Sequence, residues 1–128
     1  MANIVLVDDD RDLKQIVERL LTIKGHEVHC AGNGREAIDI VTSRPIDLVI
    51  TDILMPDMDG YELIMALRKL AAPPRIIAMS GGSGRLDSDY LLSMALRMKV
   101  DKLLYKPLSI AVIDAAISEV LGGVVQEQ

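Results

Sequence analysis

Residues 3–25 encode a predicted β-strand followed directly by a predicted α-helix, in the stretch NIVLVDDDRDLKQIVERLLTIKG. The apolar run at residues 4–7 is short and rich in β-branched side chains, as expected of a strand buried on both faces of a parallel sheet. After three aspartates the apolar period changes to that of a helix with one apolar face, formed by Leu13, Ile16, Val17, Leu20 and Leu21. Gly25 is typical of the position just past a helix end.

This strand-and-helix unit occurs five times along the chain. The predicted strands cover residues 4–7, 28–31, 48–51, 76–79 and 102–105. Helical periods follow them, as in Leu63, Ile64 and Leu67, in Leu91, Met94, Ala95 and Met98, and in Ile113, Ile117, Val120 and Leu121. Pro45 and the pair Gly122-Gly123 predict where the second and the last helix end. Such units, joined by right-handed crossovers, form a doubly wound α/β fold around a five-stranded parallel sheet.

The composition is consistent with one small domain. The 128 residues are 50% hydrophobic but include no Phe or Trp and only three Tyr, so we expect an aliphatic core. We expect the single cysteine, Cys30, to be a small core residue, and a lone cysteine favours a reducing, cytoplasmic location. There is no apolar run of the roughly 20 residues that a membrane span needs, and the first residues do not resemble a signal peptide.

The negative charge is concentrated in the first half of the chain. Residues 1–60 contain twelve acidic and six basic residues, whereas residues 61–128 contain seven and eight, which agrees with the net charge of −5. An acidic excess argues against nonspecific binding to nucleic acid, which requires a basic surface.

Polar residues follow the predicted strands at the points where ligands bind in open α/β sheets. Asp8, Asp9 and Asp10 follow the first strand, Asp52 follows the third, Ser80 the fourth, and Lys106 the fifth. If the first and third strands are neighbours, their carboxylates converge and require a positive partner, for which Mg²⁺ is well suited. With a lysine and a hydroxyl nearby, the chemistry indicated is phosphoryl transfer onto an aspartate.

The chain resembles the receiver domain of two-component response regulators. The resemblance rests on the polar residues above, on Lys106-Pro107, and on the segment Asp52-Ile53-Leu54-Met55-Pro56-Asp57-Met58-Asp59-Gly60. The resemblance implies a flavodoxin-like (βα)5 fold of strand order 2-1-3-4-5, with a receiver domain at residues 1–122 and a short tail at 123–128. It implies a phosphorylation-dependent switch rather than an enzyme acting on an external substrate.

The resemblance also implies roles for individual residues. Asp52 would be the phosphoacceptor, and Ser80 and Lys106 would contact the phosphoryl group. Mg²⁺ would be held by Asp9, Asp52 and the backbone carbonyl of Leu54, with Asp8 contributing mainly through a water molecule. The donor would be a sensor histidine kinase or a phosphotransfer protein. An unknown output partner would bind the face formed by the fourth helix, the fifth strand and the fifth helix, with no direct contact to nucleic acid or membrane.

The chain departs from the family pattern at four positions. Leu103 stands where most receivers have the aromatic residue whose rotation reports phosphorylation, and Leu108 stands where many have Phe. Leu54 and Gly82 occupy positions that often carry polar side chains orienting the hydrolytic water. We therefore expect slow autodephosphorylation and a switch that is relayed without an aromatic at position 103.

Three other readings remain open at the sequence level. Gly32-x-Gly34-x-x-Ala37 fits a dinucleotide-binding fingerprint, although a turn that starts a helix explains it as well. The chain could be one domain of a larger transcription factor, kinase or enzyme. It could also be a hydrolase that uses Asp52 as its nucleophile, although it lacks an insertion to cover a substrate.

Leu54→Asn should accelerate loss of the phosphoryl group from Asp52, because a polar side chain at position 54 can orient an attacking water molecule. The measurement is the decay of the acylphosphate after removal of the phosphodonor. An unchanged lifetime would show that the side chain at position 54 does not limit hydrolysis.

Overall fold

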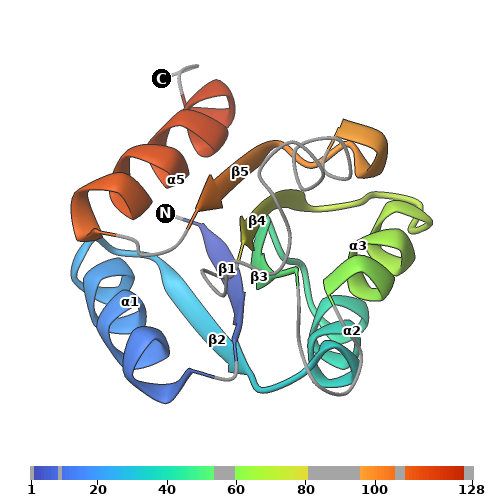
Figure 1. Ribbon diagram of the computed structural model, residues 1–128, viewed down its shortest axis with the longest axis horizontal. Coiled ribbons are helices and arrows are strands. Elements are labelled where there is room, and N and C mark those ends of the chain that lie inside the picture. Colours follow the sequence, from blue (N-terminus) through green and yellow to red (C-terminus); the bar gives the residue numbers. More distant parts are fainter. Residues whose placement is uncertain (1, 9, 54–59, 81–95, 106–108, 126–128) are drawn as a thin grey trace.

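A parallel sheet of five strands in the order β2-β1-β3-β4-β5 forms the centre of the computed structural model (Figure 1). The structure describes residues 2–8, 10–53, 60–80, 96–105 and 109–125, except the side chains of residues 61, 80 and 123–125. The strands are β1 (Asn3–Val7), β2 (Glu27–Ala31), β3 (Leu48–Asp52), β4 (Arg75–Ser80) and β5 (Lys102–Tyr105). They confirm the predicted strands to within a residue at each end, and the predicted strand order.

Helices cover both faces of this sheet. Helices α1 (Arg11–Ile23) and α5 (Ile110–Val125) lie on one face, and α2 (Gly34–Ser43) and α3 (Gly60–Arg68) lie on the other (Figure 1). Residues 96–98, before β5, are also helical. Of the apolar residues predicted for the fourth helix, Met98 is buried, and the other three lie outside the described residues. Within the residues that the structure describes, none of the helices has the length and apolarity that a membrane span requires.

The core is aliphatic, as predicted, and is divided by the sheet into two layers. One layer packs under α1 and α5, and it includes Leu6, Leu21, Ile50, Ile77 and Ile117. The other packs under α2 and α3, and it includes Val7, Val49, Leu63, Leu67 and Ile76. Neighbouring residues of one strand contribute to opposite layers, which is why the strands read as continuous apolar runs.

Side chains cap the first turns of helices α1 and α5. The Asp10 carboxylate accepts a hydrogen bond from the backbone N–H of Leu13 (3.1 Å) at the start of α1. Ser109 Oγ accepts one from the N–H of Val112 (3.1 Å) at the start of α5. Such caps satisfy amide groups that a helix leaves unpaired at its first turn. Asp10 and Ser109 are therefore the N-caps of α1 and α5.

Three predictions about single positions are wrong. Ile16 is 50% exposed, whereas Val17 and Leu21 of the same helix are buried and Leu13 packs against the core, so α1 faces the sheet with those side chains and not with Ile16. Cys30 is exposed because β2 is an edge strand that the helices cover incompletely. Helix α5 does not end at Gly122-Gly123 but continues to Val125, since glycine weakens a helix without terminating it.

Replacing Gly25 or Gly122 by alanine makes the same chemical change in two different backbone conformations. Gly25 has a φ of +92°, Gly122 lies within α5, and a Cβ added at either position would meet no atom within 4 Å. Gly25→Ala should lower the free energy of unfolding by about 1–2 kcal/mol, because alanine is strained at positive φ. Gly122→Ala should raise it by about 0.5–1 kcal/mol, because alanine favours the helix. Urea denaturation measures both, and a shared sign would contradict the backbone explanation.

His26 ties the start of β1 to the turn before β2. Its Nδ1 accepts a hydrogen bond from the backbone N–H of Ala2 (3.1 Å), which requires an unprotonated nitrogen. Burial lowers the pKa of His26, and the charges of the amino terminus and Lys24 act in the same direction, while Asp114 opposes them. The folded protein therefore binds this proton less readily than the unfolded chain does.

The free energy of unfolding should accordingly fall as the pH decreases from the ordinary histidine value of 6.5 through the lowered pKa of His26. His26→Asn retains an acceptor for the Ala2 amide but cannot titrate, so it should lose less stability between pH 8 and pH 5.5. Urea denaturation of both proteins at the two pH values measures the difference. Equal losses would exclude His26 as the origin of this pH dependence.

Candidate functional site

Two acidic residues lie buried side by side at the centre of the carboxyl edge of the sheet. Val7 of β1 pairs with Thr51 of β3, and these neighbouring strands lie about 4.8 Å apart. Asp8 follows β1 directly, and Asp52 is the last residue of β3. Asp8 is completely buried and Asp52 is 4% exposed. The chain leaves β1 for β2 on one side, and β3 lies on the other, so this is the topological switch point where α/β folds bind ligands.

The backbone around Asp8 fixes the direction of its carboxylate. Asp8 Oδ1 accepts a hydrogen bond from the N–H of Asp10 (2.9 Å), and the N–H of Asp8 bonds to the carbonyl of Ala31 on β2 (3.3 Å). Since Asp10 caps α1, the start of this helix and the carboxylate of Asp8 are held by one short turn. The sequence singled out both residues but not this link between them.

The backbone around Asp52 is held even more closely. The N–H of Ile53 bonds to the carbonyl of Met79 on β4 (2.9 Å), and the N–H of Gly60 bonds to the carbonyl of Ile53 (2.7 Å). Thr51, completely buried, donates its hydroxyl proton to the carbonyl oxygen of Asp52 (3.0 Å). These contacts connect β3, β4 and the first residue of α3 at the candidate phosphoacceptor.

The structure describes only part of the remaining predicted site. Ser80 is the last residue of β4, and its main chain lies one residue beyond Met79, the partner of Asp52. Its side chain, Asp9, Leu54 and Lys106 lie outside the described residues. The structure therefore brings together Asp8, Asp52 and the backbone of Ser80 at one edge, and it leaves the other predicted contacts untested.

The described donors suit a hard divalent cation. Asp8 and Asp52 supply carboxylate oxygens, the ligand type that Mg²⁺ prefers, and two buried carboxylates on adjacent strands repel each other when both are ionised. Within the described part of the chain, no three His, Cys, Asp or Glu side chains are grouped closely enough to hold a metal. Two of the four predicted ligands, Asp9 and the Leu54 carbonyl, are outside that part.

The glycine motif at residues 32–37 is explained by a helix start. Asn33 caps α2 by accepting the N–H of Glu36 (2.9 Å), and Glu36 in turn accepts the N–H of Gly32 (2.6 Å). The Gly32 amide, which a bound pyrophosphate would need, is thus engaged by a carboxylate of the same chain. This geometry disfavours the dinucleotide-binding reading.

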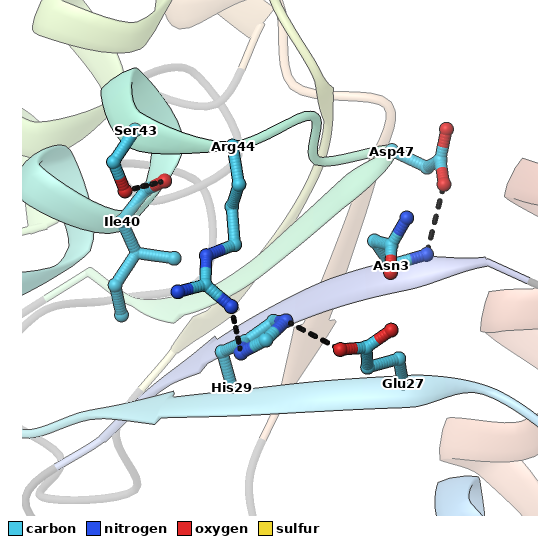
Figure 2. A network of polar contacts seen from close by, with 7 residues as sticks. All are labelled: Asn3, Glu27, His29, Ile40, Ser43, Arg44 and Asp47. Carbon is cyan, nitrogen blue, oxygen red and sulfur yellow. Dashed lines mark hydrogen bonds and ion pairs between the residues drawn. The ribbon is translucent and has the colours of Figure 1, made fainter.

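The two histidines also have structural contacts rather than a shared ligand. Figure 2 shows His29 between Arg44, whose Nη1 lies 3.4 Å from its Nδ1, and Glu27, whose Oε2 lies 3.6 Å from its Nε2. These contacts join the edge strand β2 to the residue that follows α2. His26 contacts the Ala2 amide instead, so the two histidines have different partners.

Strand β5 carries the position of the missing aromatic. Leu103 is partly buried against the core layer under α2 and α3. Tyr105, two residues further along the strand, pairs with Ser80 and is 44% exposed. The aromatic side chain of β5 therefore lies two residues closer to the carboxyl end of the strand than position 103, at the edge where the site lies. Position 103 itself carries an aliphatic side chain.

The fold and the paired acids define the class of the protein, and the comparison of sequences agrees. The sequence model of the response regulator receiver domain matches residues 4–118, so the chain belongs to this family. Receiver domains are components of two-component signalling systems, and this confirms the resemblance seen in the sequence.

Individual relatives show how far the similarity extends. The probable transcriptional regulator ycf27 of Cyanidium caldarium is 34% identical over 93% of this chain and 46% of its own length. The transcriptional regulatory protein CpxR of Escherichia coli is 34% identical over 94% of this chain and 50% of its own. The chain thus spans about half the length of these relatives.

Solved structures of receiver domains superpose over nearly the whole chain. A two-component response regulator from Clostridium difficile has a TM-score of 0.86 at 27% identity, covering 98% of this chain and 99% of that one. The chemotaxis protein CheY4 of Vibrio cholerae has a TM-score of 0.85 at 27% identity, covering 94% and 99%.

Proposed function

We propose that the protein accepts a phosphoryl group on Asp52 and changes conformation in response. The observation that carries this proposal is the burial of Asp8 and Asp52 side by side at the switch point of a receiver fold. Loop acids that merely cap helices do not need to be buried, whereas a metal-assisted nucleophile gains from a pocket with little competing water.

In the proposed reaction a carboxylate oxygen of Asp52 attacks the phosphorus of a phosphohistidine. The oxygen–phosphorus bond forms, the nitrogen–phosphorus bond breaks, and the histidine leaves with the electron pair and takes up a proton. Mg²⁺, held by Asp8, Asp9, Asp52 and the Leu54 carbonyl, would neutralise negative charge in this step. Ser80 would donate a hydrogen bond to the phosphoryl oxygens, and Lys106 would pair with their charge.

The donor in this proposal is a sensor histidine kinase or a phosphotransfer protein in the cytoplasm. The phosphoryl group would draw Ser80 and Lys106 inward and alter the face formed by the segment before β5, by β5 and by α5, which an output partner would read. The curated relatives are transcriptional regulators about twice as long as this chain, which supports an output domain as that partner. We place the receiver at residues 1–122 and a tail at 123–128, whose first residues continue helix α5 as far as Val125.

Asp52→Asn should abolish phosphoryl incorporation, because the amide is not a competent nucleophile. Asp47→Asn is the matched control, because Asp47 precedes β3 at the opposite edge of the sheet, where its carboxylate accepts the N–H of Asn3 (2.8 Å). The measurement is acid-labile phosphate on the protein after incubation with Mg²⁺ and acetyl phosphate or a phosphorylated kinase. Labelling that persists in Asp52→Asn would contradict the assignment of the phosphoacceptor.

A further inference from the structure

Thr51 is a buried polar side chain in the central strand β3, directly before Asp52, the last residue of this strand. The preceding residues of β3 are Leu48, Val49 and Ile50, and all of them are buried. Thr51 is also completely buried, between Val7 of β1 and Ala78 of β4 in the sheet register. A valine would fill this space with nearly the same shape, so packing does not explain why the position carries a hydroxyl group.

The hydroxyl group acts on the residue that follows it. Thr51 Oγ1 donates a hydrogen bond to the carbonyl oxygen of Asp52 at 3.0 Å. This bond closes a short ring that contains ψ of Thr51 and both φ and ψ of Asp52. These torsions set the direction in which the Cα–Cβ bond of Asp52 leaves the strand, and hence the position of its carboxylate.

Gly60 confines the same peptide group from another side. A Cβ built on Gly60 would overlap the carbonyl oxygen of Asp52 and would lie 2.6 Å from Cα of Ile53 and 2.8 Å from the carbonyl carbon of Asp52. The first residue of α3 therefore packs directly against the backbone that carries the phosphoacceptor. Its N–H also bonds to the carbonyl of Ile53 (2.7 Å), which fixes the next peptide group.

We propose that Thr51 is a positioning residue for phosphoryl transfer, whose hydroxyl group, together with the close approach of Gly60, orients the carboxylate of Asp52. This inference rests on the proposed role of Asp52 as phosphoacceptor. Small displacements of a nucleophile reduce the rate of an in-line displacement strongly, so one hydrogen bond at this point affects the reaction without touching the phosphoryl group.

Two matched pairs of proteins isolate the hydroxyl group. Unmodified Thr51 and Thr51→Val have nearly the same shape, and Thr51→Ser and Thr51→Ala both lack the γ-methyl group. In each pair the protein with the hydroxyl should be phosphorylated about fivefold to tenfold faster, the factor that one hydrogen bond provides. The measurement is the rate constant for labelling of Asp52 in the full chain by acetyl phosphate at saturating Mg²⁺. Urea denaturation gives the stability of each variant.

Thr42→Val serves as the control for the chemical change. Thr42 lies on α2, and its exposed hydroxyl bonds to the carbonyl of Ile38 (2.8 Å), so the labelling rate should not change. If Thr51 is a positioning residue, the labelling rate should depend on whether the side chain carries a hydroxyl group and not on the free energy of unfolding of the variant. Because the Ser and Ala pair repeats the comparison, the test does not depend on Thr51→Val folding.

Equal rates within both pairs would overturn the inference, and so would rates that follow stability alone. Either result would leave the proposed function intact, provided that the unmodified chain is labelled at Asp52. A complete absence of labelling in the unmodified chain, with a positive control for the donor, would instead overturn the proposed function and this inference together.

Discussion

The parallel pairing of β1 with β3 is the interaction on which the rest of the structure depends. Its register, Val7 opposite Thr51, places Asp8 and Asp52 at the same height and leaves both at the end of a buried strand. A shift of one residue would turn each side chain to the other face and separate the two carboxylates. The buried residues 4–7 and 48–50, all apolar and covered by helices on both faces, fix this register. The hydrophobic core and the candidate site therefore depend on the same strand pairing.

The sequence predicted this arrangement because its main signals are local. Five short apolar runs, each followed by a helical period, were sufficient for the strands, and the polar residue after each run indicated the edge where a site would form. The errors occurred where the outcome depends on tertiary surroundings. Whether Ile16 faces the sheet depends on how α1 is rotated against it, and the exposure of Cys30 depends on β2 being an edge strand.

The site itself was predictable only in part. The acidic residues can be recognised in the sequence, but the contacts that hold Asp52 in place cannot. Thr51 and Gly60 contact backbone atoms of Asp52, and a motif of side chains does not reveal such contacts. The available signal for Thr51 was a hydroxyl group that follows three apolar strand residues and directly precedes the candidate phosphoacceptor. Gly32 shows the opposite case. Its motif fitted a nucleotide-binding fingerprint, but its N–H is bonded to the carboxylate of Glu36 in the helix that follows.

The absence of tryptophan and the position of Tyr105 have a spectroscopic consequence. Ultraviolet fluorescence of this chain comes from its three tyrosines, and Tyr105 is the one whose side chain the structure describes, half in solvent and paired in register with Ser80. Tyr105 is the last residue of β5 and directly precedes Lys106 in the sequence. The chain thus contains an intrinsic optical probe beside its own candidate site, with no indole emission to mask it.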